Sequence, residues 1–372
     1  MMKNVMGIIN LYEKNRSLFE LTNHRPVAAI PFLGRFRIID FALSNMTNSG
    51  ITNVGVFVQE KPRPLTEHLG QGRWWELDGK KDGLFIFYPY YNTINSMYTT
   101  EMKNFKDNID YIEQSTQEYV VISSSYMVCN LNFNDVVEYH VKSNNDITIM
   151  YKEVNNAKSE FLGCDTLEMN EDGRVTSFSI NNGDEEKRNI SMEIYIMKKQ
   201  LLIKLINQAN TLSAMYSLRE TLVYDCNKLK INGYKYDGYL ICINNTSAYY
   251  KHSMEQLDIK YRNQLFNPER PIYTVVRDNA PAYYKKGAQI KNSLVANGAI
   301  IEGTIENSII SRGVKIAKGA VVKNSIIMSR CIIGEGVYMD CVISDKNTIF
   351  SRIKEISGTK ERPIVFEKNS VL

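Results

Sequence analysis

A short motif that recurs through the last quarter of the chain constrains the fold more than any other feature. The tetrapeptides NSLV, NSII, NSII and DCVI begin at positions 292, 307, 324 and 340, so they recur every 15 to 17 residues. Aliphatic residues stand four to six positions apart in the same segment, mostly with a small residue two positions earlier. These aliphatic positions are Ile290, Val295, Ile301, Ile305, Ile310, Ile316, Val322, Ile327 and Ile333. One such repeat cannot bury a core alone, so consecutive repeats must stack into a solenoid.

The repeat resembles the hexapeptide repeat of left-handed parallel β-helices, in which each face of a triangular coil places one aliphatic side chain inside. We therefore expect a β-helix of four coils over residues 287–372, with a β-sandwich of alternating strands as the alternative. Tyr338, Phe350 and Phe366 add aromatic area to this domain. They are expected either to bury against a neighbouring subunit or to pack under the tail of the chain.

The preceding part of the chain reads as an α/β domain. Over residues 1–255, short apolar runs alternate with amphipathic stretches, which is typical of a mostly parallel sheet covered by helices. Strands are expected at 53–58, 83–88, 118–123, 146–154 and 191–197, helices at 40–49, 102–114, 134–143 and 199–207, and a hairpin turn at 170–175. Residues 256–286 form a connector, because three prolines there break any long helix. With 372 residues, two domains are the expected arrangement.

Composition excludes several classes of protein. Six cysteines are scattered without CxxC spacing, which predicts neither a disulfide framework nor a zinc site. The net charge is +4 without a dense basic run, so a nucleic-acid-binding role is not indicated. The first apolar run is too short for a signal peptide or a membrane span, so we expect a cytoplasmic protein with no membrane partner.

Residues 31–51 contain the densest set of chemically informative side chains. Leu33 and Gly34 predict a turn, and Arg35 and Arg37 are two apart, so both would point the same way on an extended segment. Guanidinium groups suit phosphate or carboxylate partners. Asp40 stands in an apolar run, so we expect it to cap the following helix or to pair locally.

This stretch is similar to the GGKYRIIDFALSN segment of the glucose-1-phosphate adenylyltransferases, or ADP-glucose pyrophosphorylases, and the likeness extends with gaps across nearly the whole chain. The resemblance implies a Rossmann-like, GT-A-like nucleotidyltransferase domain before the β-helix. Members of the family make ADP-glucose and pyrophosphate from ATP and glucose 1-phosphate. Such chemistry needs backbone amides around the phosphates, a lysine, and carboxylates that hold Mg²⁺.

The positions that match the family's reacting groups hold other residues in this chain. The glycine-rich GGxGxRL loop corresponds to residues 12–18, which contain no glycine. Val27 stands for the lysine of KPAVPF and Asn181 for the lysine of EKP. Tyr126 stands for the aspartate of the Ser-Gly-Asp-His motif, and Cys242 for the aspartate of GYWxDVGT. The GTADA segment is altered at residues 100–102. Neither tyrosine nor a lone thiol is a ligand that Mg²⁺ prefers, so no metal or other cofactor is expected in this chain.

The family's effector residues are better preserved. In the KRAKP and GGKFR segments Arg25 and Arg37 match, while His24 replaces a lysine. The resemblance implies that these three residues bind a phosphorylated sugar or nucleotide effector. Structural salt bridges made by the same arginines are the alternative reading.

We therefore interpret the chain as a non-catalytic, GlgD-type regulatory subunit of ADP-glucose pyrophosphorylase. It would act in glycogen biosynthesis in a hetero-oligomer, expected to be a tetramer, with a catalytic homologue that alone needs Mg²⁺. An active glucose-1-phosphate adenylyltransferase is the alternative. A hexapeptide-repeat acyltransferase is disfavoured, because such enzymes take a basic histidine from their coils and all four histidines here precede position 287.

Overall fold

The computed structural model describes residues 2–12, 18–89, 100–211 and 216–372, and its contacts divide the chain into two compact units. Unit 1 comprises Met1–Asn15, Phe41–Leu240 and Pro268–Tyr273, and unit 2 comprises Arg16–Asp40, Ile241–Asn267 and Thr274–Leu372. Each unit gathers segments that are far apart in sequence. The linear boundaries expected at 255 and 286 remain predictions.

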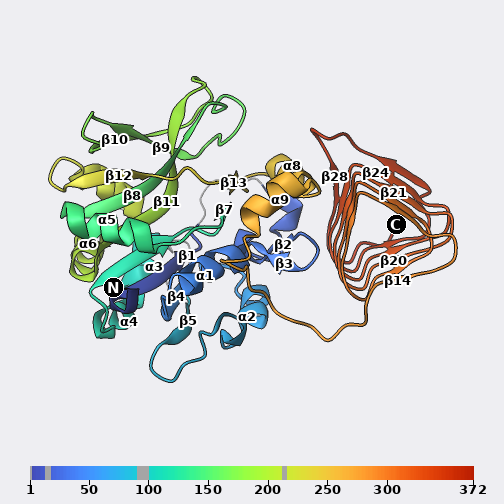
Figure 1. Cartoon of the computed structure of the whole chain (residues 1–372), viewed down its shortest axis with the longest axis horizontal. Coiled ribbons are helices and arrows are strands. Elements are labelled where there is room, and N and C mark those ends of the chain that lie inside the picture. The colour runs from blue at the N-terminus through green and yellow to red at the C-terminus, as the bar shows by residue number, and fades with distance from the viewer. Residues whose placement is uncertain (1, 13–17, 90–99, 212–215) are drawn as a thin grey trace. The chain divides into compact units, whose positions relative to one another are not determined.

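A nine-stranded mixed sheet forms the centre of unit 1 (Figure 1). Its main path runs β10-β9-β11-β6-β1-β4-β5, and β8 pairs with both β11 and β12. The strands are β1 (Val5–Asn10), β4 (Asn53–Phe57), β5 (Gly83–Phe87), β6 (Tyr119–Ser123), β8 (Ile147–Val154), β9 (Asp165–Met169), β10 (Val175–Ile180), β11 (Arg188–Lys198) and β12 (Ile231–Lys235). Strands β5, β4, β1 and β6 are parallel, whereas β11 runs antiparallel to β6, β8 and β9. Four of the nine strands thus form the expected parallel part of the sheet, and β12 adds a further parallel pair with β8.

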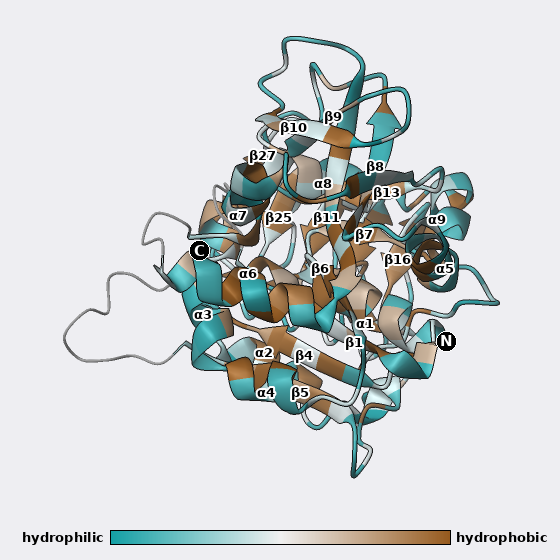
Figure 2. Cartoon of the chain, turned by 90° about the vertical axis from the view of Figure 1, so that its left-hand side faces the viewer, coloured by the Kyte–Doolittle hydropathy of each residue, from teal (hydrophilic) through white to brown (hydrophobic). Residues whose placement is uncertain are grey.

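Helices cover this sheet and bury its apolar strands. They are α1 (Ile38–Asn48), α2 (Arg63–Leu69), α3 (Glu101–Asp107), α4 (Ile109–Gln114), α5 (Asn134–Ser143), α6 (Lys199–Thr211) and α7 (Leu218–Asp225), and α1 begins in unit 2. Figure 2 shows apolar colour along β1, β4 and β6 and on one side of α6. Apolar residues of the strands, of α3 and of α6 form one buried cluster. Burying such a face is the main stabilising contribution to a sheet covered by helices.

The helix expected at 102–114 is divided in two. Asn108 separates α3 from α4, and its side-chain amide donates to the backbone oxygen of Asn104 at 3.0 Å. Asparagine side chains compete for helical backbone groups in this way, so the break has a local cause.

The solenoid of unit 2 consists of three parallel sheets of five strands each, wound as a left-handed β-helix (Figure 1). The first sheet is β14 (Tyr283–Tyr284), β17 (Ile300–Ile301), β20 (Lys315–Ile316), β23 (Ile332–Ile333) and β26 (Ile349–Phe350). The second is β15 (Gln289–Lys291), β18 (Thr304–Glu306), β21 (Val321–Lys323), β24 (Tyr338–Asp340) and β27 (Glu355–Ser357). The third is β16 (Leu294–Val295), β19 (Ile309–Ile310), β22 (Ile326–Ile327), β25 (Val342–Ser344) and β28 (Ile364–Phe366). The expected β-helix is confirmed, but it has five coils instead of the four expected, because strands also form before the first repeated tetrapeptide and after the last one.

The recurring Asn-Ser pair builds one corner of the coil. Asn292, Asn307 and Asn324 have φ of 42°, 45° and 43°, in the left-handed region that asparagine tolerates better than most residues. The following serine accepts a backbone hydrogen bond from the next coil, as when Ser325 N–H donates to the Ser308 hydroxyl at 3.1 Å. This corner chemistry explains why the pair recurs once per coil.

The two ends of the solenoid differ. At the C-terminal end, the last residues fold back on the coil: Ser351 N–H donates to the Leu372 carbonyl at 2.7 Å. Phe350 is buried and packs edge-to-face on Phe366, with ring centroids 5.0 Å apart. Phe350 thus packs under the tail of the chain, as in the second of the two expected outcomes, and Phe366 of that tail is half-buried.

Unit 2 also contains a small hairpin and two helices. The hairpin joins β2 (Pro31–Phe32) to β3 (Phe36–Arg37), and the helices are α8 (Thr246–Glu255) and α9 (Ile259–Leu265). Gly34 has φ of 78°, and a side chain there would face the Ile310 carbonyl at 3.4 Å, so glycine suits this close approach. Within the described residues, none of the helices combines the length and apolar character that crossing a membrane requires.

Candidate functional site

Tyr126 is fully buried just before β7 (Met127–Cys129), in unit 1. Its hydroxyl donates to the carboxylate of Glu193, which stands at a bulge of β11 with φ of 52°. A non-glycine residue in this conformation is strained, so the surrounding structure must hold Glu193 in place. The position that we expect to match the family's metal aspartate therefore holds a phenol already engaged in an internal hydrogen bond.

Asn181 is also committed to the fold of unit 1. Its side-chain nitrogen lies 2.8 Å from the Ala157 carbonyl and 3.1 Å from the carbonyls of Glu160 and Phe161. Its side-chain oxygen accepts from the Gly183 N–H at 3.1 Å. Asn181 thus satisfies backbone groups of a neighbouring loop, which buried polar groups require. It has no polar group left over to bind a sugar phosphate.

The remaining altered positions are buried or structural where they are described. Val27 begins a short 3-10 helix and is buried, and Cys242 is a buried reduced thiol at the end of β13 (Leu240–Cys242). Thr100 caps α3 by accepting from the Lys103 N–H at 3.1 Å. Of the segment that replaces the glycine-rich loop, residues 13–17 lie outside the described residues.

The residues at the two positions expected to hold the metal do not fit Mg²⁺. Tyr126 and Cys242 offer a phenol and a thiol instead of carboxylate oxygens, and each is buried in its own unit. Among the described residues, no group of three or more His, Cys, Asp or Glu side chains gathers into a possible metal site.

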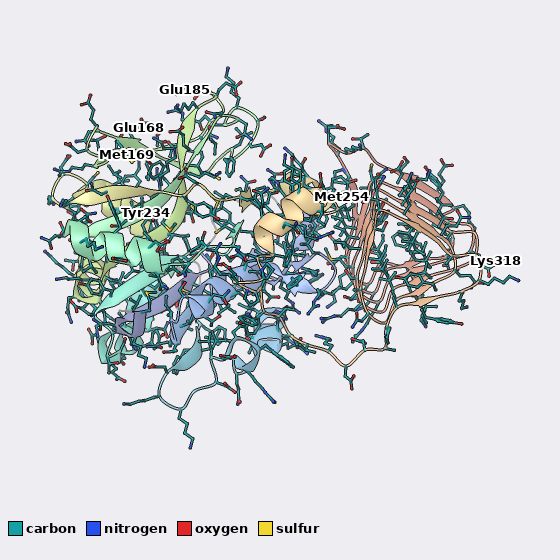
Figure 3. All side chains as sticks on the ribbon, viewed as in Figure 1. Glu168, Met169, Glu185, Tyr234, Met254 and Lys318 are labelled. Atoms are coloured by element: carbon teal, nitrogen blue, oxygen red, sulfur yellow. The ribbon has the colours of Figure 1, made fainter. Side chains whose placement is uncertain are left out.

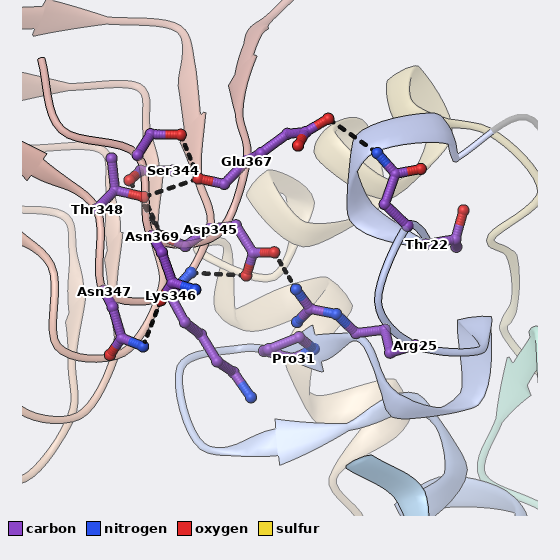
Figure 4. Close-up of polar contacts among 12 residues, drawn as sticks. Thr22, Arg25, Pro31, Ser344, Asp345, Lys346, Asn347, Thr348, Glu367 and Asn369 are labelled. Atoms are coloured by element: carbon purple, nitrogen blue, oxygen red, sulfur yellow. Dashed lines mark hydrogen bonds and ion pairs between the residues drawn. The ribbon is translucent and has the colours of Figure 1, made fainter. Parts of the chain in front are cut away.

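The effector candidates divide into a buried and an accessible set. Arg25 is 4% exposed and forms an ion pair with Asp345, which is fully buried (Figure 4). Asp345 also accepts from the Lys346 N–H at 2.6 Å. Arg25 therefore neutralises a buried carboxylate, as in the salt-bridge reading, while His24 is exposed.

Arg37 is half-buried and lies close to Lys346, a residue that stands in none of the family motifs. Burial, followed by the charges of Arg37 and Arg25, lowers the pKa of Lys346 to about 7. Lys368 acts in the same direction and Asp345 opposes it. We call Arg25, Arg37, Lys346 and Lys368 the cationic cluster. Its positive charges repel one another, a condition that a bound anion relieves.

A second positive site, the arginine pocket, lies within unit 2 and has a volume of about 480 Å³. It is lined by Arg35, Arg262, Arg277 and Arg312, by apolar residues, and by no acidic residue among those described; the others are Leu33, Phe36, Phe266, Val276, Leu294, Val295, Ala296, Asn297 and Ile310. Burial, together with the charges of Arg35 and Arg277, lowers the pKa of Arg312. The pocket can hold a small anion that also has an apolar part.

The structure separates Arg35 from Arg37, contrary to the expectation that they point the same way. Arg35 belongs to the turn before β3, so strand alternation does not apply to it, and it lines the arginine pocket. Asp40 accepts from the Arg37 N–H at 2.9 Å, which confirms the expected local pairing at the start of α1. Residues 286–372 hold 13 Lys and Arg against 8 Asp and Glu, and this excess is the only signal in the sequence for Arg312 and Lys346.

Comparison with known proteins agrees with this architecture. Residues 15–238 match the nucleotidyl transferase family, and residues 278–362 match the GlmU-like C-terminal hexapeptide family. The chain is 37% identical over 372 residues to the glycogen biosynthesis protein GlgD of Bacillus subtilis, which covers 99% of this chain and 96% of that protein. It is 32% identical over 327 residues to the glucose-1-phosphate adenylyltransferase of Thermotoga maritima, with 87% and 77% covered. The corresponding enzyme of Fervidobacterium nodosum is 30% identical over 351 residues, with 94% and 84% covered.

Proposed function

Because the chain belongs to the glucose-1-phosphate adenylyltransferase family, which includes GlgD, we propose that it is a non-catalytic regulatory subunit of glycogen biosynthesis in the cytoplasm. It acts by associating with a catalytic homologue, and Mg²⁺ is needed only in that partner. The observation that carries the proposal is Tyr126, whose buried hydroxyl is bonded to Glu193 where the family has a metal-binding aspartate. Asn181, bonded to its own loop, supports the same conclusion.

The open end of the solenoid is the surface that we assign to the partner. Within the described residues, strands β14, β15 and β16 each pair on one side only, so their outer edges keep unpaired backbone groups. Tyr283 is 61% exposed, and Ile290 is 39% exposed although it stands in register with buried Ile305. A catalytic homologue with its own hexapeptide strands can extend this edge and cover the exposed apolar residues.

The two positive sites supply the regulatory role. The arginine pocket offers four guanidinium groups and an apolar floor, which suits a small phosphorylated or carboxylated effector. The cationic cluster contains Arg25 and Arg37 of the expected effector residues and adds two lysines, whereas His24 is not part of it. In this proposal Arg37 and Lys346 contact the effector, and Arg25 positions Asp345.

The test combines the purified chain with a homologue that has an intact glycine-rich loop and both metal aspartates. The chain alone, given ATP, glucose 1-phosphate and Mg²⁺, should form no ADP-glucose above a protein-free control. The mixture should elute as one larger species, and its turnover or effector response should differ from that of the homologue alone. Activity of the isolated chain, or a mixture that behaves as the sum of its components, would contradict the proposal.

A matched pair of variants locates the interface. Ile290→Lys places a charge on the open end, whereas Ile332→Lys places the same charge on a solenoid face at nearly equal exposure, 38% against 39%. We expect the first variant to weaken association with the homologue by at least about tenfold and the second to leave it unchanged. Equal effects of the two variants would exclude the open end as the interface.

A further inference from the structure

A long groove in unit 2 has a lining unlike that of either positive site. It lies between α8, α9 and the asparagine corner of the solenoid, and its volume is about 900 Å³. Its lining mixes planar amides, aromatic rings and charges of both signs: Ser247, Tyr250, Lys251, Met254, Glu255, Leu257, Asp258, Ile259, Tyr261, Asn292, Asn307, Asn324, Lys360 and Glu361. We call it the corner groove, and Figure 3 labels Met254 on its helical side.

The asparagine ladder along this groove is interrupted. Asn292 donates its side-chain amide to the Asn307 oxygen at 2.8 Å, and Asn324 donates to Asp340 at 2.8 Å. Between them, within the described residues, the Asn307 amide nitrogen donates no hydrogen bond and the Asn324 side-chain oxygen accepts none. Both residues line the groove, so a donor and an acceptor on successive coils are left for a ligand. Successive coils are about 4.8 Å apart, comparable with the length of one sugar ring.

The opposite wall offers apolar surface. The Tyr250 hydroxyl donates to the Asn324 backbone carbonyl, which fixes its ring against the solenoid. Tyr261 and Met254 are half-buried, and Ile259 is 61% exposed. Tyrosine rings present a flat apolar face with a polar tip, which suits the C–H faces of pyranose rings.

The charges of the corner groove distinguish its ligand from that of the arginine pocket. The lining contains two lysines, Lys251 and Lys360, and three acids, Glu255, Asp258 and Glu361. Charges of mixed sign attract neither a phosphate nor another anion, in contrast to four arginines without an acid. Polar groups of both kinds beside aromatic rings suit a neutral ligand with many hydroxyl groups.

From this geometry we infer that the corner groove binds a linear oligosaccharide, with successive sugars pairing with Asn307 and Asn324 and one ring lying on Tyr261. The choice of an α-linked glucose polymer as the ligand rests on the proposed role in glycogen biosynthesis. Binding the polymer would hold the subunit near the acceptor for which ADP-glucose is made.

The test measures binding of maltoheptaose to the full chain by calorimetry, and retardation by glycogen in affinity electrophoresis, both without the catalytic homologue. Asn307→Asp keeps the acceptor used by Asn292 and tolerates the same backbone conformation, but it removes the amide donor. We expect about fivefold weaker binding for this variant and about tenfold weaker binding for Tyr261→Ala.

Asn369→Asp is the matched control. Asn369 also has a positive φ, 67°, and accepts from another asparagine, Asn347, at 3.0 Å, but it lies outside the groove. The Asn369→Asp variant should bind maltoheptaose as tightly as the unaltered chain does. Circular dichroism should show that Asn307→Asp, Tyr261→Ala and Asn369→Asp are all folded. No binding at millimolar maltoheptaose, or equal binding by Asn307→Asp and Asn369→Asp, would overturn the inference.

The experiment separates this inference from the proposed function. If maltoheptaose does not bind while the chain still alters the homologue's kinetics, the corner groove has no glucan role and the regulatory proposal stands. If maltoheptaose binds in the pattern given above while the kinetics of the mixture are merely additive, the regulatory proposal fails and the glucan site stands. If Asn307→Asp changes only the association with the homologue, the groove is a protein interface and the inference is wrong.

Discussion

In unit 1, the buried side chains of Tyr126 and Asn181 direct their polar atoms at other groups of the same unit. In unit 2, the arginine pocket holds four guanidinium groups around an apolar floor without a lining acid. The first arrangement stabilises a fold, and the second leaves charge for a ligand. The contrast teaches that buried polar residues of a nucleotidyltransferase domain can serve the fold alone, while another part of the same chain keeps unneutralised charge.

A variant of Arg25 tests this contrast most directly. Arg25 belongs to unit 2, but its side chain is buried and paired within its own unit, as those of Tyr126 and Asn181 are in unit 1. Arg25→Ala leaves the buried Asp345 without its ion-pair partner, so we expect a loss of about 3–5 kcal/mol in the free energy of unfolding. Urea-induced unfolding followed by circular dichroism measures this loss. Arg37→Ala, which removes a half-buried cation from the same cluster, should cost much less.

A double variant provides the control for that experiment. Asp345→Asn removes the buried charge, so adding it to Arg25→Ala should recover part of the lost stability. If Arg25→Ala is no more destabilising than Arg37→Ala, Arg25 does not stabilise the fold, and it belongs with the charges that are left for a ligand. If a variant without Arg25 binds an effector more weakly, its free energy of unfolding must therefore be measured as well, to separate lost binding from lost stability.

Restoring a family lysine should damage unit 1 and leave it inactive. Asn181→Lys removes the bonds to the surrounding loop and buries an ammonium group, so we expect a loss of about 3 kcal/mol in the free energy of unfolding. The neighbouring Asn182 is exposed, and Asn182→Lys should change stability by less than about 0.5 kcal/mol.

An activity measurement completes this prediction. Asn181→Lys and Tyr126→Asp, each assayed alone with ATP, glucose 1-phosphate and Mg²⁺, should form no ADP-glucose, because each restores one group and leaves the others absent. Turnover by either variant, or an Asn181→Lys protein as stable as Asn182→Lys, would show that the altered positions still form a site.

The solenoid could be predicted from the sequence, whereas one helix break and the arginine pocket could not. The repeat fixed the solenoid and its inward residues, because Ile290, Ile305 and Val322 stand in one register as their spacing requires. The break at Asn108 was not predicted, since it depends on one side chain competing with the helix backbone. The arginine pocket was not predicted either, because Arg35 and Arg312 come from distant parts of the chain and only folding brings them together.

The smallest expected effect concerns pH, at the cationic cluster. Sulfate is a suitable probe because its charge is constant near neutral pH. Burial and the charges of Arg37 and Arg25 lower the pKa of Lys346 to about 7, so this ammonium loses its proton as the pH rises through that value. Sulfate binding should therefore weaken by about five- to tenfold between roughly pH 6 and pH 8, as expected when one proton is taken up with the anion.

The sign of the stability effect follows from the same shift. Without an anion, the folded pKa of Lys346 lies below the ordinary value of 10.5, so above about pH 7 the unfolded chain holds a proton that the folded chain has released. The Lys346 contribution to the free energy of unfolding therefore rises with pH between these two values. Lys346→Met should abolish the pH dependence of sulfate binding, whereas Lys368→Met, at an exposed residue, should only weaken binding. If calorimetry finds the same pH dependence in Lys346→Met, the titrating group is elsewhere and the cationic cluster is not the sulfate site.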